Sequence, residues 1–284
     1  MGVRRDARDA LAAAQLQPRK RWGQNFLCDP GIVRRIVELA AVTDEPAVLE
    51  IGPGLGALTD ALAAAARRLY LIEIDRRLAA RLEARYAEQP HVRIITGDVL
   101  ALALDTMIDA PHATVVANLP YNITTPVLFR LLELRHRFPR AVLMVQREVA
   151  TRLAARPGGK DWGVLPALVQ TFAEVRIAFG VSRRSFLPPP RVESAVVEVR
   201  WAATPRVDVG DADAYRAVVR AAFGQRRKTL RNALGALATG RGFDAPALLA
   251  AFSQAGIDPG TRAERLTTAD FARLARALAA QSPA

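Results

Sequence analysis

Apolar segments alternate with segments of helical periodicity along the first two-thirds of this 284-residue chain, and this alternation limits the possible folds more than any other feature. The apolar segments are nearly continuous, as in strands that are buried on both faces of a sheet. Strands of this kind, connected by helices, form parallel sheets with helices on either face. The sequence therefore predicts an α/β, Rossmann-like fold with strands over residues 47–52, 68–74, 92–98, 114–118 and 141–146.

The pattern changes in the last third of the chain. Two strand-like segments, residues 172–180 and 193–201, follow without a long helical stretch between them, which indicates an antiparallel pair at the edge of the sheet. Helical periodicity then covers residues 214–223, 225–238, 244–255 and 270–280. We predict two domains, a sheet domain over residues 1–204 and a small all-α domain over residues 205–284.

The chain carries 40 basic and 28 acidic residues, a formal net charge of +12. Such an excess indicates a polyanionic partner, above all a nucleic acid. Two stretches contain basic residues and no acidic ones, residues 175–192 and 214–243. A single run of charge is usually a solvated face, but two unbalanced runs in a chain of this charge favour nucleic-acid binding.

Cysteine, histidine and long apolar segments are scarce in this sequence. The single cysteine, Cys28, excludes an intrachain disulfide framework, and the three histidines match no metal-ligand spacing. No uncharged apolar run reaches the roughly 18–20 residues of a membrane span, and the charged N-terminus lacks the apolar region of a signal peptide. We therefore expect a cytoplasmic protein with no metal site and no membrane segment.

Glycines and acids follow the first three predicted strands. The segment Glu-Ile-Gly-Pro-Gly-Leu-Gly at residues 50–56 places Gly52 and Gly54 where the chain must turn tightly or approach a ligand. Glu73 ends the second strand and Asp98 ends the third. In nucleotide-binding folds an acid about 20 residues after the glycine turn binds the ribose hydroxyls, and Glu73 follows Gly52 by 21 residues. Each feature alone is more often a turn or a helix cap, but together they predict a pocket for an adenosine group without phosphates.

The fourth predicted strand ends in Asn118-Leu119-Pro120-Tyr121, which matches the [DNS]-[PIL]-P-[YFW] pattern of enzymes that methylate amino groups. The Asn118 side-chain oxygen and the Leu119 carbonyl can both accept hydrogen bonds from a target amine, while Pro120 fixes the turn and Tyr121 offers a ring for an extruded base. Methylation of carbon would instead need a cysteine nucleophile near this point. The pattern predicts a methyltransferase that uses S-adenosyl-L-methionine.

Nearly the whole chain, from Lys20 to about Leu278, resembles the bacterial small-subunit (16S) rRNA adenine N6-dimethyltransferase family. The resemblance rests on colinear motifs at residues 23–29, 49–59, 72–75, 97–100, 117–126, 144–153, 186–197, 223–234 and 262–274. It implies a class I methyltransferase sheet and transfer of two methyl groups to each of two adjacent adenosines in the 3′-terminal hairpin loop of 16S rRNA. The implied substrate is the precursor 30S ribosomal subunit, the implied role is in ribosome biogenesis, and the implied state is a monomer.

The resemblance also implies roles for individual residues. The catalytic motif is Asn118, Leu119, Pro120 and Tyr121. The implied cofactor-binding residues are Asn25, Leu27, Gly52, Gly54, Glu73, Asp98, Val99 and Asn118. Phe186 would stack on the other face of the target base from Tyr121. The implied RNA-binding residues are Arg183, Arg184, Arg191, Arg226, Arg227, Lys228 and Arg231.

The chain departs from the family pattern at Asp161-Trp162-Gly163, a change that we expect to alter loop packing rather than activity. Three other functions remain open. A sister family methylates 23S rRNA and confers macrolide resistance, but it lacks the basic segment at residues 224–232. A ribosome-assembly factor whose methylation is dispensable would use the same basic helices, and a DNA adenine methyltransferase would not depend on a ribosomal particle.

Overall fold

A computed structural model describes residues 25–225, 227–240 and 244–281 of the chain. The chain divides into two compact units. The first, called the sheet unit here, comprises Met1–Ala150 and Glu174–Ala203. The second, the helical unit, comprises Thr151–Ala173 and Thr204–Ala284. This division differs from the two predicted domains in one segment, because Thr151–Ala173 groups with the C-terminal helices and not with the sheet.

The described part of the sheet unit is built on a sheet with the strand order β4-β3-β2-β5-β6-β9-β7. The strands are β2 (Val48–Ile51), β3 (Leu69–Glu73), β4 (Val92–Thr96), β5 (Thr114–Asn118), β6 (Arg140–Gln146), β7 (Ala173–Val181) and β9 (Ser194–Trp201). The pairings among β2 to β6 are parallel, and β9 pairs antiparallel with β6. The predicted Rossmann-like parallel sheet with added strands at one edge is therefore confirmed.

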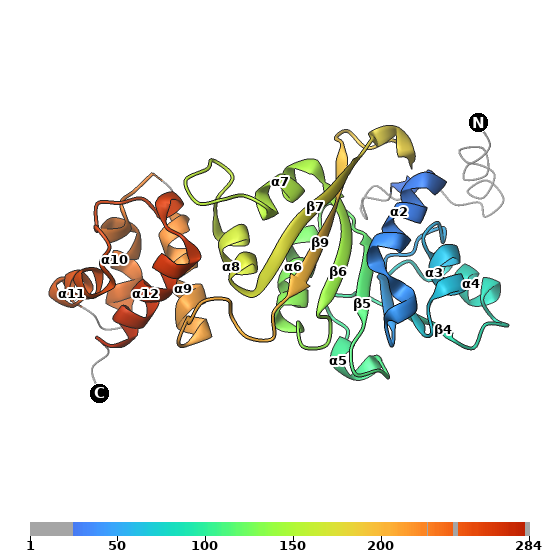
Figure 1. Cartoon of the computed structure of the whole chain (residues 1–284), viewed down its shortest axis with the longest axis horizontal. Coiled ribbons are helices and arrows are strands. Elements are labelled where there is room, and N and C mark those ends of the chain that lie inside the picture. Colours follow the sequence, from blue (N-terminus) through green and yellow to red (C-terminus); the bar gives the residue numbers. More distant parts are fainter. Residues whose placement is uncertain (1–24, 226, 241–243, 282–284) are drawn as a thin grey trace. The chain divides into compact units, whose positions relative to one another are not determined.

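Helices connect these strands: α2 (Pro30–Ala40), α3 (Thr59–Ala65), α4 (Arg76–Arg85), α5 (Leu104–Met107), α6 (Thr124–Glu133) and α7 (Arg147–Leu153). Figure 1 shows α2, α3 and α4 close to one another in the blue to cyan part of the chain. α2 begins where the Asp29 carboxylate accepts hydrogen bonds from the backbone of Gly31 and Ile32, and Pro30 occupies its first turn. Ile36 of α2 and Leu62 of α3 pack with the buried residues of β2 and β3 in one hydrophobic core.

The direction in which successive strands are added to the sheet reverses between β2 and β5. From β2 the chain continues to β3 on one side, whereas β5 pairs with β2 on the other side. In open parallel sheets the carboxyl ends of the strands diverge at such a reversal and leave a crevice for a ligand. The predicted strand ends at Gly52, Glu73, Asp98 and Asn118 all lie at this edge of the sheet.

A second, two-stranded sheet was not predicted from the sequence. Strand β1 (Phe26–Leu27) pairs antiparallel with β8 (Phe186–Leu187). The Ser185 carbonyl accepts a hydrogen bond from the Cys28 backbone N–H at 2.8 Å, and the Ser185 hydroxyl donates to the Asp29 carboxylate at 3.0 Å. The segment before α2 is thereby fixed to residues about 160 positions later in the chain.

The helical unit contains α8 (Val164–Phe172), α9 (Ala212–Gly224), α10 (Leu230–Gly240), α11 (Ala245–Ala255) and α12 (Thr268–Ala279). α8 was missed by the sequence analysis, and α10 begins at Leu230 rather than at residue 225. Trp162 is buried and donates its indole N–H to the Leu266 carbonyl at 2.9 Å, so the departure from the family pattern has a packing role. Among the described helices of the chain, none is both long and apolar enough to cross a membrane.

Candidate active site

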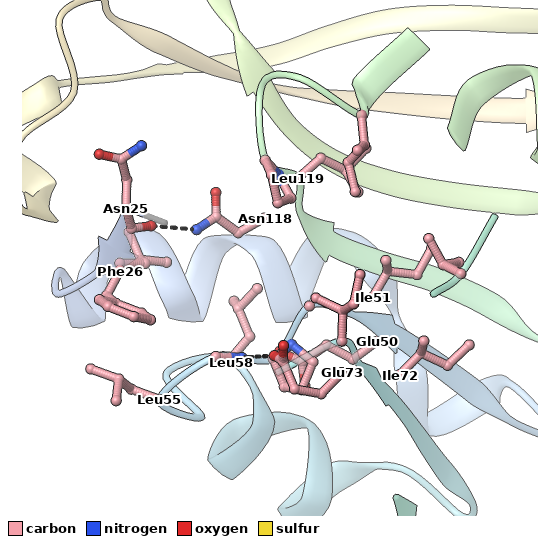
Figure 2. Close-up of a pocket in the computed structure, with 18 of the residues that line it drawn as sticks. Asn25, Phe26, Glu50, Ile51, Leu55, Leu58, Ile72, Glu73, Asn118 and Leu119 are labelled. Carbon is pink, nitrogen blue, oxygen red and sulfur yellow. Dashed lines mark hydrogen bonds between the residues drawn. The ribbon is translucent and has the colours of Figure 1, made fainter. Parts of the chain in front are cut away.

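A pocket of about 310 Å³ opens at the carboxyl ends of β2, β3, β4 and β5 in the sheet unit (Figure 2). This volume lies at the lower end of the range for small-molecule sites, about 300–1,000 Å³. Its walls are formed by residues 25–27, 50–55, 57–58, 72–74, 97–99 and 118–123. The structure therefore brings every predicted cofactor-binding residue and the whole Asn118–Tyr121 motif to one cavity.

The glycine turn after β2 forms one wall of the pocket. Gly52 and Gly54 have φ angles of 68° and 60°, a region that side chains with a Cβ disfavour. A Cβ on Gly54 would lie 3.2 Å from the ring of Phe26, so a larger residue there would require the ring to shift. The Gly54 backbone N–H donates to the Glu73 carboxylate at 3.0 Å, which joins the first strand end to the second.

Glu73 is buried, and backbone groups hold its carboxylate in place. One oxygen accepts from the Gly54 N–H, and the other accepts from the Asp75 N–H at 2.9 Å. Burial raises the pKa of Glu73 above its ordinary value, against the effect of these backbone hydrogen bonds. A carboxylate oxygen can accept more than one hydrogen bond, so the group can still bind the hydroxyls of a ligand. Asp98, at the next strand end, is exposed and accepts from the Leu100 N–H at 2.9 Å.

Glu50 is a pocket residue for which the sequence pattern predicted no role. It is 2% exposed, and one oxygen of its carboxyl group accepts a hydrogen bond from the Thr59 hydroxyl at 2.7 Å. Burial, with the nearby charges of Glu73 and Asp60, raises the pKa of Glu50 to about 8. The available signal was an acid within an otherwise apolar strand, directly before the glycine turn.

The charge of the pocket lining matches a ligand without phosphates. Glu50, Glu73 and Asp98 line it, whereas none of the described residues around it is a lysine or an arginine. Phosphate groups are normally bound by basic side chains or by the N-terminus of a helix. The chemistry of these donors and acceptors fits S-adenosylmethionine, an adenosine with hydroxyls to bind and a positively charged sulfonium.

Asn118 is held by the segment before α2. Its side-chain N–H₂ group donates to the Asn25 carbonyl at 3.1 Å, a bond drawn in Figure 2. The amide is thereby oriented with its nitrogen on the Asn25 side, and its oxygen remains the acceptor for a ligand. The Pro120 carbonyl accepts from the Ile123 N–H and the Thr124 hydroxyl, which starts α6 directly after the motif.

Phe186 lies in the hydrophobic core and not at the pocket. Its side chain is 1% exposed and belongs to the hydrophobic core with Leu27, Ile36 and Val181. Phe186 is also not among the residues that line the pocket. In this conformation the ring offers no face to a base, and the stacking role of Phe186 stays a prediction.

The predicted RNA-binding residues fall into two groups, one in each unit. Arg183, Arg184 and Arg191 are exposed in the sheet unit, and Arg227, Lys228 and Arg231 are exposed in the helical unit. Arg226 lies outside the described residues. The described residues contain no group of three or more His, Cys, Asp or Glu side chains that could hold a metal ion.

Comparison with known proteins gives consistent matches over nearly the whole chain. Residues 15–280 match the protein family described as "Ribosomal RNA adenine dimethylase". The chain is 47% identical over 272 residues to "Ribosomal RNA small subunit methyltransferase A" of Moorella thermoacetica, covering 93% of each chain. It is 46% identical to the protein of the same name from Syntrophotalea carbinolica, covering 92% of this chain and 96% of the relative.

Two solved structures are similar in fold. A dimethyladenosine transferase from Plasmodium falciparum has a TM-score of 0.75 and 26% identity, over 88% of this chain and 95% of that one. The 23S rRNA methyltransferase ErmE has a TM-score of 0.65 and 29% identity, over 90% of this chain and 100% of that one.

Proposed function

The chain belongs to the ribosomal RNA adenine dimethylase family and is an S-adenosylmethionine-dependent rRNA adenine dimethyltransferase, and from this premise we propose its substrate and the roles of its residues. We propose that it places two methyl groups on N6 of each of two adjacent adenosines in the 3′-terminal hairpin loop of 16S rRNA. The names of its curated relatives support the small subunit over 23S rRNA. The natural substrate would be the precursor 30S subunit in the cytoplasm, modified by a monomer during ribosome biogenesis.

The observation that carries the proposal is the hydrogen bond from the Asn118 side-chain nitrogen to the Asn25 carbonyl. Because this bond directs the amide nitrogen toward Asn25, the amide oxygen is the acceptor available to an amine in the pocket. That oxygen and the Leu119 carbonyl accept hydrogen bonds from the two N–H groups of the adenine, which draws the nitrogen lone pair out of conjugation with the ring. The nitrogen needs no strong base, because it loses its proton after it has become positively charged.

The cofactor, when bound, supplies an electrophilic methyl group on a sulfonium. Glu73 would accept hydrogen bonds from the ribose hydroxyls, and Asp98 with Val99 would bind the adenine. Asn25, Leu27, Gly52 and Gly54 would line the methionine end, where the φ angles of the two glycines let the backbone approach closely. The positive charge of this ligand would favour the ionised forms of the buried acids Glu50 and Glu73.

Tyr121 would stack against the extruded target base. Its pKa is raised above the ordinary value, chiefly by burial, so its hydroxyl stays protonated at neutral pH. The exposed Arg183, Arg184, Arg191, Arg227, Lys228 and Arg231 would bind RNA phosphates, together with Arg226. Binding of the subunit should then weaken steeply with salt, and neutralising the basic residues of the helical unit should reduce that slope.

The test is transfer of labelled methyl groups from S-adenosylmethionine to unmethylated 30S subunits, with the product nucleosides identified. The expected product is N6,N6-dimethyladenosine, and Asn118→Ala should abolish its formation. Transfer to 23S rRNA or to DNA, without transfer to 30S, would show that the proposed substrate is wrong. Binding of 30S without any methyl transfer would instead support a role as a ribosome-assembly factor.

A further inference from the structure

Tyr121 and Ser194 meet beside the pocket from different parts of the sheet unit. Tyr121 lies in the turn after β5 and lines the pocket. Ser194 is the first residue of β9 and pairs with Gln146 at the end of β6. The Tyr121 hydroxyl and the Ser194 Oγ are 3.0 Å apart, within hydrogen-bonding distance. A residue 73 positions further along the chain therefore contacts the distal end of the tyrosine ring.

The environment of Ser194 makes this contact hard to replace. Ser194 is 1% exposed, so water cannot satisfy its hydroxyl. In the described part of the chain, its side chain has one hydrogen bond, the bond to Tyr121. Leaving a buried hydroxyl unpaired costs more than the bond itself contributes, which favours the paired state.

The backbone around Ser194 is held on two sides. The preceding Glu193 carbonyl accepts from the Arg147 N–H at 2.9 Å, where β6 passes into α7. The Glu193 carboxylate accepts from the Arg183 N–H at 2.9 Å, at the exposed turn that carries two of the proposed RNA-binding arginines. Ser194 is thus a fixed point against which a side chain in the pocket can be oriented.

We propose that Ser194 is a positioning residue that fixes the Tyr121 ring in the orientation in which the target base stacks on it. A hydrogen bond at the far end of a tyrosine ring restricts rotation about Cα–Cβ, which would carry the hydroxyl away from its partner. It also favours the ring plane in which the phenol hydroxyl points along the bond to Ser194. A base held on a fixed ring keeps its amine aligned with Asn118, and rates of transfer are sensitive to misplacement of that size. The inference rests on the proposed function, which gives Tyr121 its role in base stacking.

Three variants test the inference: Ser194→Ala, Tyr121→Phe and the double variant. Each single change removes one side of the hydrogen bond and leaves the tyrosine or phenylalanine ring for stacking. We expect each to lower the single-turnover rate of methyl transfer to 30S by about three- to tenfold. The double variant should be no slower than the slower single variant, because the bond can be lost only once. Affinities for S-adenosylmethionine and for 30S should change by less than about twofold.

The helical unit offers a matched control with the same chemistry. Thr171 and Tyr215 are buried there, and their hydroxyls are 2.6 Å apart. Thr171→Ala and Tyr215→Phe should lower the melting temperature as Ser194→Ala does, but should leave the single-turnover rate unchanged.

Three outcomes would overturn the inference while the wild type remains active. The first is a Ser194→Ala variant with the wild-type single-turnover rate. The second is a double variant whose loss of rate equals the product of the two single losses. The third is an equal loss of rate in Thr171→Ala, which would mark a general effect of destabilisation. Failure of the proposed function is distinguishable, because the wild-type protein itself would then transfer no methyl groups to 30S.

Discussion

Two buried glutamates in the sheet unit have opposite surroundings. Glu198 on β9 and Glu50 on β2 are 3% and 2% exposed, so both have lost nearly all contact with water. Glu198 forms ion pairs with Arg140, Arg176 and Arg200 at 2.7–2.8 Å. Among the described residues, Glu50 has one hydrogen-bond partner, the neutral Thr59 hydroxyl, and the charges that act on it most are acidic.

The pKa values of the two acids move in opposite directions for this reason. Hydrogen bonds and charges from the arginines hold the pKa of Glu198 below its ordinary value, although burial opposes them. For Glu50, burial prevails and the pKa rises to about 8.

The two glutamates also differ in what they contribute to the fold. Arg140 also donates to the Leu39 and Ala40 carbonyls. The ion pair between Glu198 and Arg140 therefore connects the C-terminal end of α2 to the sheet. Glu50 contacts only the first turn of α3, through the Thr59 hydroxyl. Because burial disfavours its charge, the ionised form of Glu50 destabilises the fold. An acid that stabilises the fold has its counter-ions within the chain, whereas an acid in a pocket is left for the charge of a ligand.

The largest effect is expected from Glu198→Ala. Removing the carboxylate leaves Arg140, whose side chain is 15% exposed, without its counter-ion. Breaking a buried ion pair destabilises by about 3–5 kcal/mol, but Arg176 and Arg200 are more than half exposed, so we expect a loss of about 2–3 kcal/mol. Urea unfolding followed by circular dichroism measures the change.

The control for Glu198→Ala is Glu88→Ala, a change at an exposed acid that should alter stability by less than about 0.5 kcal/mol. The pH dependence has a definite sign. Since folding lowers the pKa of Glu198, its contribution is present above the unfolded-state value of about 4.5 and is lost as the pH falls through the folded-state value. A variant as stable as the wild type at pH 7 would show that the arginines do not need this acid.

Features that depend on local sequence pattern could be predicted, whereas features that depend on long-range pairing could not. Glu73 and Asp98 were identified because the carboxyl ends of parallel strands must meet at one edge, a consequence of local pattern alone. The burial of Phe186 was not foreseen, because it depends on the pairing of Leu27 with Phe186, which no local pattern encodes. Likewise α8 is a short and almost wholly apolar segment with seven of its nine residues buried, and such a segment cannot be told from a buried strand by its pattern alone.

A smaller effect of opposite sign is expected from Glu50→Gln in the protein without cofactor. The glutamine keeps an acceptor for Thr59 and removes the ionisable group. Because folding raises the pKa of Glu50 from 4.5 to about 8, the folded protein holds a proton that the unfolded chain has lost between these values. Wild-type stability should therefore fall as the pH rises through this window, by at most about 1.4 kcal/mol per pH unit.

Glu50→Gln should lose this dependence and exceed the wild type at pH 8 by on the order of 1–3 kcal/mol. Thermal unfolding at pH 5, 6.5 and 8 tests both points. A glutamine variant less stable than the wild type at pH 8 would mean that ionised Glu50 supports the fold, and the contrast with Glu198 would disappear.

The smallest effect is expected from Thr59→Val, which sharpens the contrast by removing the one partner of Glu50. The valine has nearly the same shape, and Thr59 is fully buried, so the change mainly deletes a hydrogen bond worth about 1 kcal/mol. This bond lowers the pKa of Glu50 and therefore stabilises its ionised form most. The loss of stability should be greater at pH 8.5 than at pH 5, and the two losses should become equal in the Glu50→Gln background. Equal losses at both pH values in the wild-type background would show that Thr59 serves packing alone.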